Sequence, residues 1–77
     1  MTNRTKQIYD FIIDYAIENG YLPTVREIGD ACSLSSTSTV QGHLEKLEDE
    51  KLITRPTPRS NRYKVEGLKY VKDNNGN

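Results

Sequence analysis

Apolar residues recur every three or four positions near the start of the chain, which is the spacing of a helix with one buried face. Between residues 4 and 19 they fall at Ile8, Phe11, Ile12, Tyr15 and Ala16. Thr2 or Asn3 is suited to cap this helix, and Gly20 is placed to end it. Ile13 and Ile17 lie roughly opposite the apolar stripe, where a solvated helix normally carries polar groups.

Two shorter helical patterns follow. Residues 24–27, Thr-Val-Arg-Glu, match a capping box and predict a helix that ends near residues 33–34. Its inward residues are predicted to be Val25, Ile28, Ala31 and Cys32. Five consecutive hydroxyl residues, Ser35 to Thr39, begin the next helix, with Ser36 as the best cap. Val40, Leu44 and Leu47 mark its buried stripe, and it should run to about Glu50 or Lys51.

The last apolar patterns are too short for helices. Residues 52–54 and 62–65 predict two strands of a hairpin, joined by a loop over residues 55–62 that contains Pro56 and Pro58. Three helices followed by a hairpin predict a mainly α fold with a small β-hairpin, the three-helix winged helix-turn-helix. We expect this domain to occupy residues 1–66, followed by a polar tail over residues 67–77.

Composition narrows the function. With 77 residues there is room for one small domain, and no apolar run approaches the roughly 20 residues of a membrane span. A single cysteine, Cys32, excludes an internal disulfide and a multi-thiol metal site, so we expect a cytoplasmic protein. We find no pattern of paired carboxylates, activated nucleophile or glycine-rich phosphate loop, and therefore expect no enzyme activity, no cofactor and no metal.

Charge is segregated along the chain although its sum is zero. Residues 27–51 carry two basic and six acidic side chains, whereas residues 52–77 carry six basic and two acidic ones. A local field, screened over about 8 Å at physiological ionic strength, can favour phosphate on one face of a neutral molecule. The basic part of the chain includes the predicted wing.

The hydroxyl run predicts a surface that reads DNA bases. Capping explains Ser36, but it does not explain Ser38 and Thr39, which with Gln41 and Gly42 should lie on the exposed face of the third helix. Short polar groups allow a helix to approach base edges in the major groove. A glycine inside a helix costs roughly 1 kcal/mol relative to alanine, and close approach to DNA or tight packing on another helix could explain Gly42.

Phosphate contacts are predicted at two places. Arg55, Arg59, Asn61 and Arg62 in the stiff loop are suited to a phosphate backbone or a minor groove. Thr24 and Arg26 at the start of the second helix form the other candidate. Arg26 could instead pair with Asp30, four residues later.

The run GYLPTVREIGDACSLSSTSTVQGHLEKLEDEKLI, residues 20–53, resembles the N-terminal DNA-binding domain of LexA repressors, which control the bacterial DNA-damage (SOS) response, especially the Gram-positive form. This resemblance implies that Ser36, Ser38, Thr39, Gln41 and Gly42 lie where LexA reads bases, at operators of the GAAC/GTTC type. LexA also has a self-cleaving peptidase domain, for which this chain has no counterpart, so its autoproteolysis is not carried over. The wing, RPTPRSNR, departs from the usual LexA pattern.

We therefore expect a sequence-specific regulator of transcription that binds double-stranded DNA, either a repressor or a competitor at operators. We expect a complete small protein of phage or mobile-element origin, with an excised repressor domain as the alternative. The alternative function is a protein-interaction module that docks on a host transcription regulator as an anti-repressor or co-repressor. For this role, or for a homodimer, Ile13 and Ile17 are the candidate interface, unless Leu68, Tyr70 or Val71 of the tail covers them.

Overall fold

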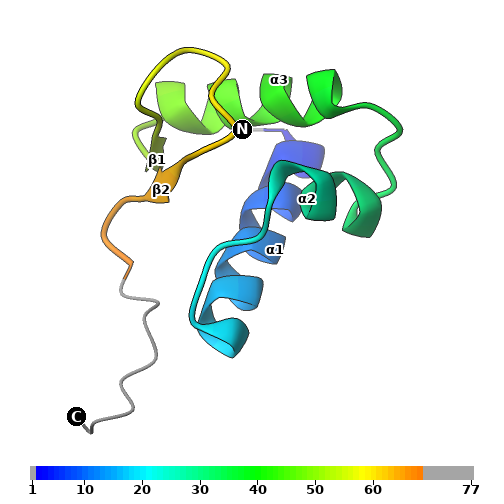
Figure 1. Ribbon diagram of the computed structural model, residues 1–77. Coiled ribbons are helices and arrows are strands. Elements are labelled where there is room, and N and C mark those ends of the chain that lie inside the picture. Colours follow the sequence, from blue (N-terminus) through cyan, green and yellow to red (C-terminus); the bar gives the residue numbers. More distant parts are fainter. Residues whose placement is uncertain (1, 69–77) are drawn as a thin grey trace, which may run out of the picture.

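The computed structural model describes residues 2–68, which form three helices and a two-stranded hairpin (Figure 1). The helices are α1 (Asn3–Asn19), α2 (Val25–Ala31) and α3 (Thr37–Asp49). The strands β1 (Ile53–Thr54) and β2 (Lys64–Val65) pair antiparallel, with Ile53 opposite Val65 and Thr54 opposite Lys64. This arrangement confirms the predicted winged helix-turn-helix, with each strand shorter than expected.

Helix α1 begins and ends where the sequence indicates. The hydroxyl oxygen of Thr2 accepts a hydrogen bond from the amide of Thr5 at 3.1 Å. Gly20 closes the helix with φ 81°, a left-handed conformation that glycine adopts readily, and its amide donates to the carbonyl of Ala16. Ile8, Ile12 and Ala16 are fully buried, which fixes the face that α1 turns towards the other helices.

The capping box of α2 is formed in full. Thr24 Oγ1 accepts from the amide of Glu27 at 3.0 Å, and a Glu27 carboxylate oxygen accepts from the amide of Thr24 at 2.8 Å. Val25, Ile28 and Cys32 are buried as predicted. The prediction for Ala31 is wrong because α2 ends there, which leaves Ala31 exposed while Cys32, the C-cap, turns into the core.

Helix α3 supplies the centre of the core. Val40, Leu44 and Leu47 are fully buried, together with Ile53 from β1. Figure 1 shows α3 crossing α1 at a steep angle, with α2 beside the first half of α3. The turn from Cys32 to Ser36 therefore sets the start of α3 next to α2, which is the geometry of a helix-turn-helix.

The segment between the two strands, residues 55–63, is the wing (Figure 1). The Tyr63 hydroxyl donates to the carbonyl of Pro23 at 2.7 Å, which attaches the returning strand to the connector before α2. The amide of Glu66 donates to the carbonyl of Leu52 and extends the hairpin. The wing is thus held at its base by a hydrogen bond between segments 40 residues apart.

Two predictions concern the end of the chain. The boundary between a domain over residues 1–66 and a tail over residues 67–77 stays a prediction, and Tyr70 and Val71 lie outside the described residues. Leu68 packs against the core. Within residues 2–68, no helix has the length and apolar character that crossing a bilayer requires.

Candidate nucleic-acid interface

The start of α3 presents a row of exposed hydroxyl groups. Ser36 is the N-cap, and its Oγ accepts from the amides of Ser38 and Thr39 at 3.1 and 3.4 Å. All residues from Ser35 to Thr39 are exposed. The hydroxyls of Ser38 and Thr39 form no hydrogen bond within residues 2–68, so both groups are available to a ligand.

Gly42 lies on the same exposed surface one turn later. A Cβ placed on it would meet no protein atom within 4 Å. The predicted alternative, tight packing against α1 or α2, therefore does not account for this glycine. We define the exposed groups of Ser36, Ser38, Thr39 and Gly42 as the hydroxyl face of α3.

Gln41 does not belong to this face. The prediction that its side chain is exposed is wrong, since the residue is 8% exposed and points towards the wing. Its Nε2 donates to the carbonyl of Ser60 at 3.2 Å and to Oδ1 of Asn61 at 2.8 Å. The wing folds back along α3 in Figure 1, and this contact explains why the amide turns inward.

Arg55 is also turned away from solvent. Its side chain is only 3% exposed, whereas the sequence predicts an exposed cation in a surface loop. Nε and Nη2 both donate to one carboxylate oxygen of Glu48, at 3.1 and 2.9 Å, and Nη1 donates to Oε1 of Gln41. Glu48 thus neutralises the charge of Arg55 inside the protein. Such pairing is needed because burying an unpaired guanidinium is unfavourable.

Other predicted phosphate contacts do remain exposed. Arg59 and Arg62 in the wing and Arg26 on α2 form no ion pair within residues 2–68, and Arg26 does not pair with Asp30. Arg59 adopts a left-handed backbone conformation, φ 64°, at the turn of the wing.

A shallow hollow brings the separate predicted sites together. It is lined by Thr24, Val25, Arg26, Thr37 and Asn61, which come from α2, α3 and the wing. Thr37 is not among the residues that the sequence predicts for this surface. Its place in the hydroxyl run was the signal that could have identified it.

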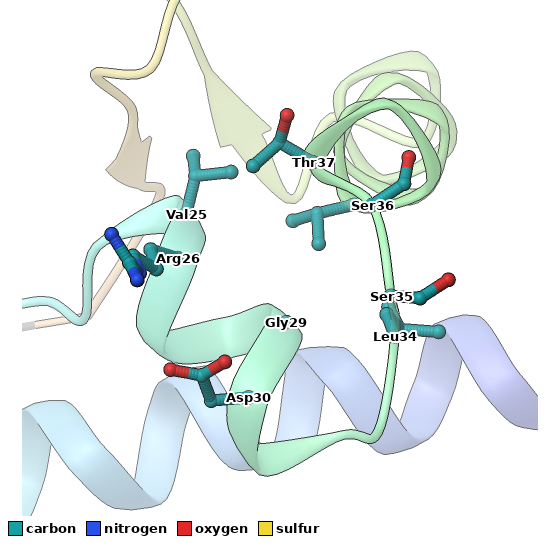
Figure 2. A pocket seen from close by; sticks show the side chains of 9 residues that line it. Val25, Arg26, Gly29, Asp30, Leu34, Ser35, Ser36 and Thr37 are labelled. Atoms are coloured by element: carbon teal, nitrogen blue, oxygen red, sulfur yellow. The ribbon is translucent and has the colours of Figure 1, made fainter.

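A second hollow lies between α2 and the start of α3 (Figure 2). Figure 2 shows the Arg26 guanidinium on the far side of α2 from Ser35 and Ser36. The serine hydroxyls also point away from α2. The cation of α2 and the serine hydroxyls before α3 therefore face the outside rather than one another.

Charge changes along the exposed side of α3. Its first two turns carry no charged side chain, whereas Glu45, Lys46 and Asp49 are exposed nearer its end and sum to one negative charge. The N-terminal end of a helix also carries a partial positive charge from its unpaired amides. A polyanion is accordingly favoured at the start of α3 and repelled at its end.

His43 has a structural contact on the other side of α3. Its Nδ1 and the hydroxyl of Thr5 are 2.9 Å apart, and Thr5 is fully buried. Burial, followed by the charges of Lys46 and Arg4, lowers the pKa of His43 from its ordinary value of 6.5. His43 therefore joins α3 to α1, and burial disfavours its charged form. The described residues contain no group of three or more His, Cys, Asp or Glu side chains that could hold a metal ion.

The predicted interface on α1 is only half exposed. Ile13 is partly buried and packs against the core, which corrects its expected position opposite the buried stripe. Ile17 is 60% exposed, and Tyr21, beyond the end of α1, is 57% exposed. The apolar strip is thereby reduced to Ile17 on α1.

Three helices, a short turn between the second and third, and a wing define a winged helix-turn-helix domain. Comparison with known proteins agrees with this class. The family profile described as the LexA DNA binding domain matches residues 1–62, and the chain belongs to this family.

Similar proteins include LexA repressors from three bacterial genera. The chain is 54% identical over 55 residues to the LexA repressor of Exiguobacterium sp., a match that covers 71% of this chain and 27% of the relative. Identity is 52% over 54 residues with that of Clostridium perfringens, covering 70% and 27%. It is 51% over 55 residues with that of Listeria welshimeri, covering 71% and 27%. The match thus spans about a quarter of each relative's length.

Proposed function

We propose that this protein binds double-stranded DNA in a sequence-specific way and represses transcription, or competes with a repressor, at operators of LexA type. The observation that carries the proposal is the hydroxyl face of α3, exposed and uncharged, in a chain of the LexA DNA-binding domain family. Small hydroxyl groups let the helix backbone approach base edges, where they can donate or accept hydrogen bonds. The similar proteins named LexA repressor support the step from DNA binding to repression.

The proposed base contacts are Ser36, Ser38, Thr39 and Gly42, with Thr37 beside them. Phosphates are assigned to the exposed cations Arg26, Arg59 and Arg62, and to the polar groups of Thr24 and Asn61. If each of the three arginines meets one phosphate, the slope of log K against log salt should be about −2.7, at about 0.9 per phosphate. The exposed carboxylates of Glu45 and Asp49 favour entry of α3 into the major groove by its first turns.

The proposed operator contains GAAC/GTTC half-sites. Helix-turn-helix proteins usually bind two symmetric half-sites about one helical turn of DNA apart, one copy on each. A single copy of this domain should therefore bind a half-site weakly, and two copies on a complete operator should bind more tightly.

Fluorescence anisotropy of a labelled duplex tests the proposal. We expect binding to a duplex with two GAAC/GTTC half-sites, weaker binding to a scrambled duplex of the same composition, and a loss of this difference when Ser38 and Thr39 are both replaced by alanine. Thr54→Ala is the control, because it removes an exposed hydroxyl from β1, where it donates to Glu66, rather than from α3. Circular dichroism should show that all variants are folded.

Equal affinity for the two duplexes would contradict sequence-specific binding through this face. If no duplex binds and a purified host regulator is retained instead, the alternative function of a protein-interaction module is favoured. The exposed Ile17 is the predicted contact for that role.

A further inference from the structure

A polar cluster with two buried side chains, those of Gln41 and Arg55, joins α3 to the wing. It consists of Gln41 and Glu48 on α3, Arg55 at the base of the wing, and Ser60 and Asn61 at its tip. Gln41 is 8% exposed and the Arg55 side chain 3% exposed, so these groups depend on one another for hydrogen bonds. Polar groups this deeply buried are unfavourable unless they are paired.

Both ends of the Gln41 amide are occupied. Oε1 accepts from Arg55 Nη1, while Nε2 donates to the Ser60 carbonyl and to Asn61 Oδ1. Arg55 also donates from Nε and Nη2 to a carboxylate oxygen of Glu48. No donor of this amide is left for a base edge in this arrangement.

The contact falls between the two exposed arginines of the wing. Arg59 directly precedes Ser60, and Arg62 directly follows Asn61. A hydrogen bond from α3 to residues 60 and 61 therefore sets how far both guanidinium groups lie from the hydroxyl face.

We infer that Gln41 is a positioning residue that holds the wing in register with the base-reading face of α3, a role that rests on the proposed function. Without the bond, the part of the wing between Arg55, which Glu48 holds, and Tyr63, which Pro23 holds, must be ordered during binding, and this ordering opposes association. The phosphate contacts of Arg59 and Arg62 then become coupled to a side chain that touches neither of them.

The salt dependence of binding distinguishes positioning from base reading. In Gln41→Ala, the wing arginines should lose their phosphates and leave Arg26, so the slope of log K against log salt should change from about −2.7 to about −0.9. A base-reading Gln41 would instead lower affinity for the specific duplex and leave the slope unchanged.

A double-mutant cycle gives an independent measurement. Arg62→Ala should weaken binding at least about twofold less in the Gln41→Ala background than in the wild type, because contacts that act together are not additive. Ser38→Ala combined with Arg62→Ala is the matched control and should be additive. If Gln41→Ala does not fold, Asn61→Ala removes the exposed partner of Gln41 instead and is read by the salt slope, because the loss of an uncharged phosphate contact by Asn61 itself leaves that slope unchanged.

Each result decides the inference. A reduced slope together with coupling to Arg62 supports it. An unchanged slope or additive effects overturn it while leaving the proposed function intact, since the wild type still binds its duplex. Failure of the wild type to bind any duplex overturns both.

Discussion

Replacing Gly42 with alanine should make the protein more stable and weaken its binding to DNA. Gly42 lies inside α3, is exposed, and has space on all sides where a methyl group would stand. Glycine in an exposed helix interior is about 1 kcal/mol less favourable than alanine. In a domain of this size, a gain of 1 kcal/mol raises Tm by about 4–8 °C.

The expected loss of affinity comes from the same open space. With Ser38 and Thr39 at base edges, the added methyl group would stand between α3 and the floor of the groove and increase their separation. Losing one base-edge contact worth about 1–3 kcal/mol lowers affinity about 5- to 140-fold. Stability and affinity should therefore change in opposite directions.

Thermal unfolding followed by circular dichroism and anisotropy with a LexA-type duplex measure the two effects. Ala31→Gly is the control, because it reverses the change in helix propensity at an exposed residue of α2 and leaves α3 untouched. A more stable Gly42→Ala protein with unchanged affinity would show that this glycine does not face DNA. A less stable one would refute the argument from open space.

Three further predictions concern stability and association. Lys51→Gly should raise the free energy of unfolding by about 1 kcal/mol in urea titrations, because Lys51 has φ 65°, and an unchanged midpoint would contradict this strain. The pKa of Glu27 is lowered from its ordinary value of 4.5, chiefly by the hydrogen bond from the Thr24 amide. The contribution of the ionised Glu27 to folding stability is therefore present at neutral pH and is lost as pH falls through the lowered pKa. Urea midpoints of Glu27→Gln should thus fall less in acid than those of the wild type, and parallel curves would exclude this cause. Ile17→Glu should leave the sedimentation coefficient of the protein unchanged. A lower coefficient for the variant than for the wild type would reveal a dimer that forms through this exposed isoleucine.

The starts of α2 and α3 and the end of α1 could be predicted because their causes are local, whereas α2 ends at Ala31, before the predicted residues 33–34. The Thr24 and Ser36 caps bond to amides two or three residues away, and Gly20 ends α1 through its own conformation. Such signals depend on a few neighbouring residues and can be recognised without knowledge of the tertiary fold.

The side chains of Gln41 and Arg55 could not be assigned in this way. Gln41 follows the buried Val40 by one residue, which places it about 100° further around α3. This position lies at the edge between the buried and the exposed face of the helix. Which side it takes depends on the wing, whose path is set by Tyr63 bonding to Pro23 across the molecule. The opposite charges of Glu48 and Arg55, on either side of the turn after α3, were the available hint.

The carboxylates of Glu45 and Asp49 also bear on discrimination between DNA and other polyanions. A flexible chain such as heparin has no groove to receive one end of a helix, and it would lie along α3 and meet the net negative charge of Glu45, Lys46 and Asp49. A duplex can admit the first turns while its backbones pass on either side. The two acids thus weaken non-specific binding to other polyanions. This matters for a protein whose few exposed arginines must find a short DNA target among a large excess of other phosphates.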